Sequence, residues 1–430
     1  MLIKVTVEVE GSEVGIVQRE LSGTAAEIEE QVKVALQQTG RILLEPAFQE
    51  VAEHTRAPVC CGHTMRNCGF RPITVSTTCG IVNVSRRRYR CAQCDREFFP
   101  VDASICCGRH RITQPLAKRV CQLATMEHFP RMPDLIAAQH GVTLAHDTIL
   151  ELVHDVGTAI DGRRMAEARR SIQRRVPPSA EQAAPARIYV SCDGIMYCTN
   201  LTEPHPDDPA RSRLSWHQMK VGCVYWQDAN ERWHKQMIWG RESPEEFGAS
   251  LWRLACQCGY REAGEKIFAA DGGSWCWEIH ARYFSDATGI LDWYHASEHI
   301  WAAAKIITAD TKAWASSALG QMHDGGGTAL LTWLKLQLPH SRGKRRAALD
   351  DLINYVATKV NLMQYPEYRS HDWQIGTGMM ESTCKQLVGQ RLKGPGMHWS
   401  DQGALAITAL RAVHFNGKWN SYWNTLALSI

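Results

Sequence analysis

The sequence lacks the long apolar runs that cross a membrane. No segment of its 430 residues is apolar enough over a sufficient length to span a bilayer. The first ten residues alternate apolar and polar side chains, which is typical of a β-strand and not of a signal peptide. We also find no internal repeat of fixed period, so a repeat architecture is not expected. The absence of a membrane span and of an export signal predicts a cytoplasmic protein of the bacterial type.

A strong charge imbalance is also missing. The formal net charge is only +3, and the contents of 44% apolar and 22% charged residues are ordinary for a globular chain. The length predicts about two to four domains. The basic residues are nevertheless clustered, which suits a polyanionic partner, although each cluster alone could be a solvated helix face. The clusters are Arg86, Arg87, Arg88 and Arg90; Arg163, Arg164, Arg169, Arg170, Arg174 and Arg175; and Lys344, Arg345 and Arg346.

Cysteine is abundant, with sixteen residues scattered along the chain. Without an export signal they predict reduced thiols and one metal site. Cys91-Ala-Gln-Cys94 is half of a zinc knuckle, and Cys60 with Cys61 lies upstream as the other half of a structural Zn²⁺ site. Adjacent cysteines are expected to chelate one ion poorly, so either one of the upstream pair is joined by another ligand or the ribbon binds no metal. The further candidates are His54, His63, Cys68, Cys79, Cys106 and Cys107.

Residues 132–153 fit two helices around a turn at Gly141, as in a helix-turn-helix. Val142 would fill the turn, and Ile149 and Val153 would form the core face of the second helix. That helix would enter the DNA major groove. An ordinary helical hairpin is the alternative, but the neighbouring arginine-rich ribbon favours DNA binding. The side chains expected near the bases are Thr143, His146, Asp147 and Thr148.

From residue 187 the pattern becomes α/β. Three strands, a helix, a strand, a helix, a strand and then helices follow one another, which is the order of an RNase H-like domain. In that fold the first strand is central and the fourth lies beside it. The expected strands are 187–198, 220–226, 233–239, 265–270 and 289–293, and the helices are 244–257, 275–284, 296–362 and 381–392.

Three acidic residues occupy special places in this pattern. Asp193 lies in the first strand, Asp271 follows the fourth, and Glu381 begins a helix that is otherwise basic. An acid in an apolar strand is costly to bury unless it is paired or metal-bound, and strand ends are favoured site positions. Three carboxylates could hold the two Mg²⁺ ions used in phosphodiester cleavage. The alternative is that the Asp-Gly pairs are only turns, but the strand order and Glu381 favour the metal site.

The later turns of this last helix carry basic residues. Lys385 lies one turn after Glu381 on the same face, and Arg391 and Lys393 follow. We expect these three cations to hold DNA phosphates. Trp399, after the Gly-Pro-Gly turn, is a candidate for stacking on a frayed terminal base.

Residues 56–425 resemble a DDE-type transposase of a bacterial insertion sequence, of the Kra-type group with Mutator-like relatives. The motifs that carry the resemblance are Cys192-Asp-Gly, Ala270-Asp-Gly-Gly-Ser-Trp, Ile290-Leu-Asp-Trp-Tyr-His-Ala-Ser-Glu-His and residues 376–399. The resemblance implies an RNase H-like catalytic domain with an all-helical insertion. It also implies cutting and joining of element ends, with Asp193, Asp271 and Glu381 holding Mg²⁺ or Mn²⁺.

Two further residues match an Asp-x-x-His pattern of such relatives. Asp292 and His295 are expected to support the metal ligands or to touch the DNA end. Asp292 is also the rival of Asp271 as the second metal ligand, and the remaining alternative is a structural acid paired with His295 or His299.

The predicted function is a DNA transposase that binds terminal inverted repeats and works as a homodimer or higher oligomer on double-stranded DNA. The alternatives are a regulator without catalysis and a metal-dependent nuclease without strand transfer. The predicted domains are 1–55, a strand and helix for packing or oligomerisation; 56–108, a zinc-ribbon-like segment; 109–160, the helix-turn-helix-like region; 161–186, a basic linker; 187–299 and 371–430, the RNase H-like core; and 300–370, the helical insertion.

Overall fold

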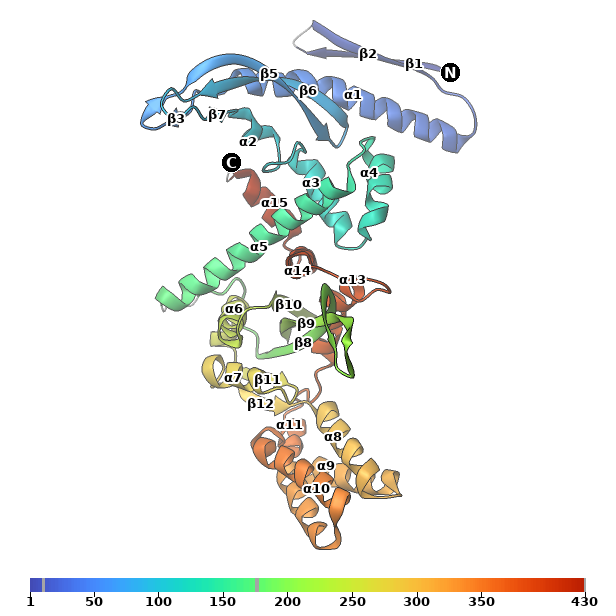
Figure 1. Ribbon diagram of the computed structural model, residues 1–430, viewed down its shortest axis with the longest axis vertical. Helices are drawn as coiled ribbons and strands as arrows, with labels where there is room; N and C mark the ends of the chain where they lie inside the picture. Colours follow the sequence, from blue (N-terminus) through green and yellow to red (C-terminus); the bar gives the residue numbers. More distant parts are fainter. Residues whose placement is uncertain (10–11, 175–177, 429–430) are drawn as a thin grey trace. The chain divides into compact units, whose positions relative to one another are not determined.

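The computed structural model describes residues 1–9, 12–174 and 178–428, and Figure 1 shows its elements. It is a mixed α/β protein with two compact units, one of Met1–Gly157 with Gly417–Ile430 and one of Thr158–Asn416. Within the described residues, no helix is both long and apolar enough to cross a membrane. Arg175 of the second basic cluster lies outside the described residues.

The first unit begins with a ribbon and a long helix. Strands β1 (Leu2–Val9) and β2 (Ser12–Glu20) pair antiparallel, and α1 (Ala25–Glu53) packs on them. A capping box starts α1, because the Thr24 side chain accepts a hydrogen bond from the Glu27 amide while the Glu27 carboxylate accepts one from the Thr24 amide. The sequence predicted one strand before this helix, and the structure has two.

A cysteine- and arginine-rich sheet follows. The strands are β3 (Val59–Cys60), β4 (His63–Thr64), β5 (Arg66–Thr77), β6 (Gly80–Arg90) and β7 (Glu97–Phe98). Strands β5, β6 and β7 form one antiparallel sheet, while β3 and β4 form a separate hairpin. Alternate residues of β5 and β6, including Val75 and Val82, are buried against α1 and the short helix α2 (Val101–Ile105).

The helical part of this unit comprises α3 (Gln114–Ala124), α4 (Met132–His140), the first half of α5 (His146–Arg174) and α15 (Trp419–Leu428). Gly141 ends α4 in the left-handed conformation, with φ of 65°. Val142, Ile149 and Val153 are buried, as the sequence pattern predicted. Helix α15 contacts α3 through Gln114, whose Nε2 donates to the Trp423 carbonyl oxygen.

Helix α5 is longer than the sequence indicated. It runs on to Arg174, so the arginine-rich start of the predicted linker 161–186 is helical. Arg164 explains this order, because its buried guanidinium bonds both Asp161, one turn earlier, and Glu242. Composition predicted a basic linker here, and the paired acids supply the tertiary contacts that support a helix instead.

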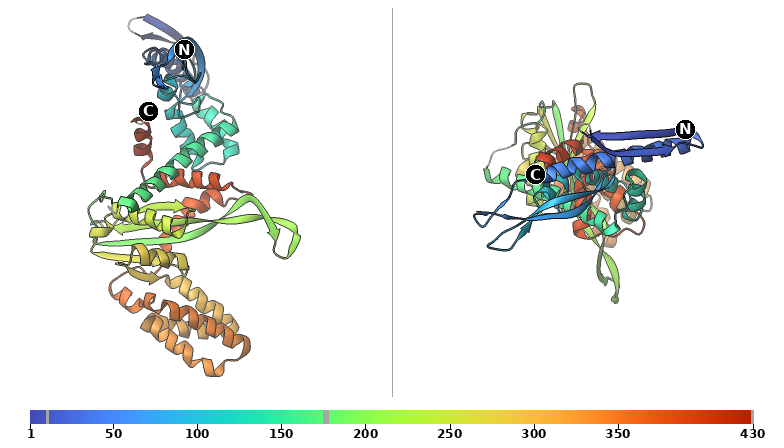
Figure 2. Two further views of the ribbon diagram at one scale, coloured as in Figure 1. Left: turned by 60° about the vertical axis from the view of Figure 1, so that its left-hand side comes forward. Right: turned by 90° about the horizontal axis from the view of Figure 1, so that it is seen from above.

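The second unit contains a five-stranded sheet. Strands β8 (Arg187–His205), β9 (Asp208–Gln227) and β10 (Trp233–Gly240) are antiparallel, and β11 (Glu265–Ala270) and β12 (Thr288–Leu291) run parallel to β8. The spatial order is β10-β9-β8-β11-β12. The first strand is therefore central, with the fourth beside it. Figure 2 shows β8 and β9 continuing as a hairpin beyond the other strands, a polar extension without the buried face that sequence periodicity detects.

Different helices cover the two faces of this sheet. Helices α6 (Pro244–Gln257) and α7 (Ser274–Tyr283) bury the face that carries Val190 and Cys192. Residues of α12 (Gly378–Cys384), a π-turn at Lys385–Gly389, α13 (Gln390–Leu392) and α14 (Asp401–Phe415) lie on the other face. The predicted helix 381–392 is thus interrupted by the π-turn. Arg411 of α14 stabilises the interruption by donating to the carbonyl oxygens of Gln386 and Leu387.

The segment between β12 and α12 is helical, as predicted. It comprises α8 (Trp293–Ile307), α9 (Thr311–Leu336), α10 (Gly343–Lys359) and α11 (Tyr365–Ser370). Helix α9 is kinked at Gly326, which has φ of 65°. A side chain there would also come within 2.6 Å of the Met363 carbonyl oxygen, so the kink requires glycine.

Candidate functional site

Two aspartates follow the last residues of β11 and β12, and a third lies at the same level within β8, just past the end of its parallel pairing with β11. Cys192 of β8 pairs with Ala270 of β11, which in turn pairs with Leu291 of β12. The next residues are Asp193, Asp271 and Asp292, and parallel strands are spaced about 4.8 Å apart. The Asp292 amide donates a hydrogen bond to the Ala270 carbonyl oxygen at 2.9 Å, so the hydrogen bonding between β11 and β12 continues as far as Asp292. Acids far apart in the sequence therefore meet at one edge of the sheet.

Asp193 is partly buried at this edge. Its Oδ1 accepts a hydrogen bond from the Gly194 amide at 2.6 Å, and the Cys384 thiol of α12 lies 3.9 Å from its Oδ2. Burial raises the pKa of the Asp193 carboxyl, and the negative charge of Asp271 raises it further. The two carboxylates are thus close enough to repel each other.

Asp271 lies where β11 ends and α7 approaches. Its Oδ1 accepts a hydrogen bond from the Gly273 amide at 2.9 Å. Within the described ranges, its other carboxylate oxygen accepts no hydrogen bond and keeps its lone pairs for a ligand. Gly272 allows a close approach here, because a Cβ would come within 2.9 Å of His295 Nε2 and the ring would have to shift. Asp271 is therefore oriented by its own turn and remains able to bind a cation.

Asp292 has a different environment. It is only 3% exposed, and its Oδ1 accepts a hydrogen bond from the His295 amide at 2.6 Å, which caps α8. Its Oδ2 accepts bonds from the Thr377 amide at 2.5 Å and the Thr377 hydroxyl at 2.6 Å. Both oxygens are engaged by structural donors, which favours Asp271 over Asp292 as the metal ligand.

Removing the Asp292 carboxylate should destabilise the fold. We expect Asp292→Ala to lower the free energy of unfolding by about 2–4 kcal/mol, because it removes a helix cap and leaves the buried donors of Thr377 unsatisfied. Thermal or urea unfolding measures this. The matched control is Asp310→Ala, since Asp310 caps α9 through the Ala313 amide but is exposed; its loss should cost about 1 kcal/mol. Equal losses of unfolding free energy in the two variants would show that the hydrogen bonds from Thr377 to Asp292 do not add to stability.

Glu381 reaches the same region from α12. The helix begins beside Asp292, through Thr377, and Cys384 near its end contacts Asp193. Glu381 is exposed and precedes Cys384 by three residues, so both lie on one side of the helix. Among the described residues, the only group of three or more potential ligand atoms within 4.8 Å of one another is a cysteine cluster. Asp193 and Asp271 thus share one edge of the sheet, Glu381 lies on the helix beside it, and the three carboxylates do not converge within this distance.

The basic residues after Glu381 separate into two kinds. Lys385 and Lys393 are exposed and remain candidates for phosphate contacts. Arg391 is only 2% exposed, with its guanidinium carbon 4.9 Å from the centre of the Trp399 ring. Trp399 is 9% exposed and donates its indole hydrogen to the Leu392 carbonyl oxygen. The predicted roles of Arg391 on DNA phosphate and of Trp399 on a base are therefore corrected, because the two side chains bury each other.

The cysteine cluster is formed by Cys60, Cys61, Cys91 and Cys94, whose sulfur atoms all lie within 4.8 Å of one another. Cys60 Sγ is 3.8 Å from Cys61 Sγ and 3.6 Å from Cys94 Sγ. Four thiolates around a tetrahedral Zn²⁺ with bonds of about 2.3 Å would be separated by about 3.8 Å. The cluster could therefore hold a structural zinc ion.

The adjacent cysteines converge because of the turn that carries them. Cys61 and Gly62 connect β3 to β4, with φ of 50° and 80°. Two left-handed residues form the tight turn that suits a two-residue hairpin, and this turn brings both sulfur atoms to one side. The expectation that adjacent cysteines chelate poorly is thereby corrected. In the described part of the chain, none of the other candidate ligands joins the group.

The thiols of this cluster differ in acidity. The amides of Cys94 and Gln93 lower the pKa of Cys91 to about 7. Hydrogen bonding with Cys94 and Cys60 raises the pKa of Cys61 to about 12. A thiolate at one position thus opposes ionisation of its neighbours, and a divalent cation is what relieves such repulsion.

The arginines of β6 form ion pairs and ring contacts with residues of the same cysteine-rich region. Arg86 pairs with Asp102 and packs over Phe99, Arg88 pairs with Glu97 at 3.2 Å, and Arg90 pairs with Asp95. Arg87 lies over the Phe70 ring at 5.4 Å. These acids offset much of the positive charge, and DNA binding by the run stays a prediction.

The predicted base-contacting residues lie around the start of α5. Thr143 and His146 are exposed, and Thr148 is half-buried. Asp147 is exposed beside them, with His146 Nδ1 3.4 Å from its Oδ1. The helix that would carry them into a groove is 29 residues long, longer than the short second helix predicted. Their role in DNA binding also stays a prediction.

Two residues beside the acids were not predicted. Cys384 contacts Asp193, and its spacing of three residues from Glu381 is the one sequence signal that could have found it. Tyr355 of α10 lies near Asp271 and Asp292; burial raises its pKa, and their charges add to the rise. No local pattern indicates Tyr355, because it reaches the site only through the packing of α10 on α8.

Comparison with known proteins gives little guidance. No protein-family model matches the sequence, and no curated protein matches it. Among solved structures, the chain is similar to a chain of a Drosophila P element transposase strand transfer complex, with a TM-score of 0.23 and 9% sequence identity. That similarity covers 73% of this chain and 80% of the other. At this level of similarity the likeness fixes neither the fold nor the activity.

Proposed function

We propose that this protein is a DNA transposase, which cuts DNA strands at terminal inverted repeats and joins the freed ends to a target. The observation that carries the proposal is the placement of Asp193 and Asp271 side by side, where the parallel pairing of β8 and β11 ends, with Glu381 on the helix that contacts Asp193 through Cys384. The sheet order β10-β9-β8-β11-β12 supports an RNase H-like catalytic domain, because it has the first strand central and the fourth beside it.

The acidic site fits Mg²⁺ or Mn²⁺. These ions prefer hard oxygen ligands, and a cation between Asp193 and Asp271 would offset the repulsion that raises the pKa of Asp193. Asp193 and Asp271 would hold the ions from the sheet, and Glu381 would hold them from α12. When bound, two such ions activate the attacking water or hydroxyl and stabilise the leaving oxygen.

The remaining residues of the site would position DNA. Exposed Lys385 lies one turn after Glu381, so a phosphate held by it lies next to the carboxylates. Exposed Lys393 would add a second contact. The cysteine-rich sheet and the start of α5 would bind the element ends, and pairing of two ends would require at least a homodimer. The partner is double-stranded DNA of the element ends and of the target.

Metal-dependent cleavage and joining test this proposal. The full chain is incubated with Mg²⁺ and duplexes taken from the DNA that flanks the gene, and both nicked and joined products are measured. We expect both kinds of product. Cleavage without joining would overturn the proposal in favour of a metal-dependent nuclease. Binding to the ends without any cleavage would overturn it in favour of a DNA-binding regulator.

The raised pKa of Asp193 makes a separate prediction on stability. A carboxyl whose folded-state pKa lies above its unfolded value stabilises the fold at low pH, and this contribution is lost as pH rises through the folded pKa. We therefore expect Asp193→Asn to stabilise the metal-free protein by about 0.5–2 kcal/mol near neutral pH. The gain should vanish below about pH 4, where the unfolded carboxyl is also protonated.

Asp401 provides the control of opposite sign. Although burial acts to raise its pKa, hydrogen bonds from Tyr197, His217 and Arg241 lower the pKa of Asp401 overall. We expect Asp401→Asn to destabilise the protein at neutral pH. Urea unfolding at several pH values measures both variants. If metal-free Asp193→Asn is less stable than wild type at neutral pH, the ionised Asp193 carboxylate does not destabilise the fold, and the prediction is wrong.

A further inference from the structure

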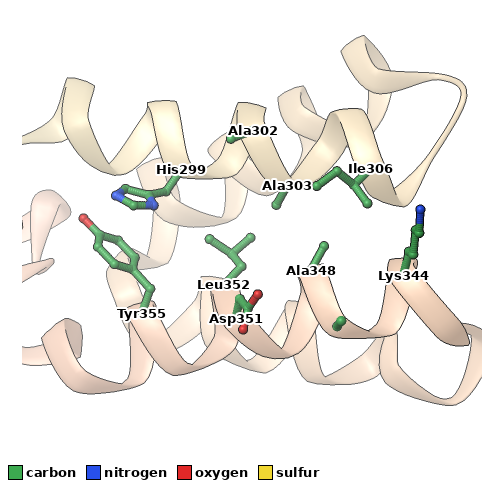
Figure 3. A pocket seen from close by; sticks show the side chains of 10 residues that line it. His299, Ala302, Ala303, Ile306, Lys344, Ala348, Asp351, Leu352 and Tyr355 are labelled. Carbon is green, nitrogen blue, oxygen red and sulfur yellow. The ribbon is translucent and has the colours of Figure 1, made fainter. Parts of the chain in front are cut away.

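An open groove lies between helices α8 and α10. One end of the groove, at Tyr355, lies near Asp271 and Asp292. The groove is lined by apolar side chains such as Ile306 and Leu352, and Figure 3 shows His299 and Tyr355 facing each other at one end of it. The rings of His299 and Tyr355 are stacked, with centres 3.9 Å apart. This end of the groove is the only part of its lining with an imidazole.

A second histidine completes a pair at this end. His295 precedes His299 by four residues on α8, so both side chains lie on one face of the helix. Their Nε2 atoms are 3.3 Å apart. Two imidazole nitrogens on one tetrahedral ion, with bonds of about 2.0–2.1 Å, are separated by about 3.3–3.4 Å. The observed distance fits a hydrogen bond between the two rings and fits shared coordination of one ion equally well.

The surroundings hold both rings in place and favour a cation. His295 Nε2 is brought close to Gly272, where a side chain would collide with it, and the His295 ring lies within electrostatic reach of Asp193. Stacking on Tyr355 fixes the His299 ring. The Tyr355 hydroxyl is buried without a hydrogen-bond partner in the described part of the chain, so a polar group remains to be satisfied beside the pair.

The protonation state also suits a metal ligand. Partial desolvation of the ring against Tyr355 lowers the pKa of His299 although the residue as a whole is exposed, and the nearby His295 and Lys359 lower it further, while Glu298 opposes them. The neutral imidazole is the form that binds metal ions. Lys359 lies over the Tyr355 ring, with its Nζ 4.7 Å from the ring centre.

We propose that His295 and His299 together bind one divalent transition-metal ion through their Nε2 atoms. Imidazole ligands select ions such as Zn²⁺, Ni²⁺ and Cu²⁺ over Mg²⁺, so this site differs in kind from the carboxylates at Asp193 and Asp271. It also differs from the cysteine cluster, because water must supply its remaining ligands. We expect exchangeable binding, weaker than that of the four cysteines. The proposal does not depend on the proposed transposase activity.

Metal binding to the full chain tests this proposal directly. The cysteine cluster is first loaded with Zn²⁺, and Ni²⁺ is then titrated near neutral pH by calorimetry, with the zinc content checked afterwards. Ni²⁺ is the probe because imidazole sites bind it more tightly than Mn²⁺ or Co²⁺. We expect one Ni²⁺ per chain, and a loss of affinity of about tenfold or more in His299→Ala. The control is His340→Ala, an exposed histidine in the 3-10 turn Leu338–His340 after α9, which should leave this binding unchanged.

The second variant is His295→Ala, which should lose Ni²⁺ binding to the same extent while keeping its thermal transition. If it fails to fold, His299→Ala decides, since His299 is exposed. The proposal is overturned if the wild-type protein binds no Ni²⁺ in the calorimetric titration, or if His299→Ala binds Ni²⁺ as tightly as His340→Ala does. Because the measurement is of binding, its failure is distinct from a failure of DNA cleavage.

Discussion

Replacing Asp193 or Asp271 by Asn, or Glu381 by Gln, is expected to abolish DNA strand cleavage while leaving binding to element ends intact. Each change removes a charged oxygen ligand and keeps the size of the side chain. Metal ions contribute several kcal/mol of transition-state stabilisation, and about 1.4 kcal/mol corresponds to tenfold in rate. We expect a fall of at least about 10³-fold in the cleavage rate for each variant.

Single-turnover cleavage of a labelled end duplex measures the rate, and electrophoretic mobility measures binding. Glu278→Gln is the matched control, because Glu278 is an exposed acid on α7 near Asp271 in the sequence but is not placed at the strand ends. It should cleave at the wild-type rate. Retained cleavage in any of the three variants would remove that residue from the metal-binding set, and retained cleavage in Asp271→Asn would reopen the choice of Asp292.

Replacing Cys91 by Ser is expected to remove the structural zinc and to unfold the sheet region around it. Cys91 is buried and its sulfur is held by the amides of Gln93 and Cys94, so no other side chain can take its place. The free energy of structural zinc binding is about 10–16 kcal/mol in small zinc domains. We expect the zinc content to fall from one ion per chain to none, with loss of a thermal transition.

Cys68→Ser is the control for this change. Cys68 lies on β5 within the same region and was a candidate ligand from the sequence, but it does not belong to the four-cysteine group. It should retain zinc and its melting behaviour. Zinc content by elemental analysis and the fraction of free thiols distinguish the two variants. One zinc per chain in Cys91→Ser would contradict the assignment of ligands.

The sequence pattern was informative where function depends on strand ends. Asp193 and Asp271 could be predicted to meet because the first lies in the central strand and the second follows the strand expected beside it, where strand ends favour a site. The choice between Asp271 and Asp292 could not be made in this way, since both follow strands. It depends on the hydrogen bonds from Thr377, which lies 85 residues after Asp292 and approaches only in the folded chain.

Residues with long-range partners were the ones that the pattern placed wrongly. Arg391 and Trp399 look like exposed DNA contacts in a basic helix, but they bury each other. Arg164 looks like part of a linker, but its partner Glu242 lies 78 residues away. The convergence of Cys60 and Cys61 required backbone angles that composition does not reveal.

By itself, the sequence determined the element order of the α/β unit, the helical segment after β12 and the chemical identity of the candidate ligands, because local periodicity and residue type carry that information. Only the tertiary structure decided three further points. Asp292 caps helix α8, the sulfur atoms of four cysteines lie within 4.8 Å of one another, and the Nε2 atoms of His295 and His299 lie 3.3 Å apart. Each of these depends on side-chain direction and on contacts between residues in different elements or turns, which free rotation about backbone bonds leaves open until the chain is packed.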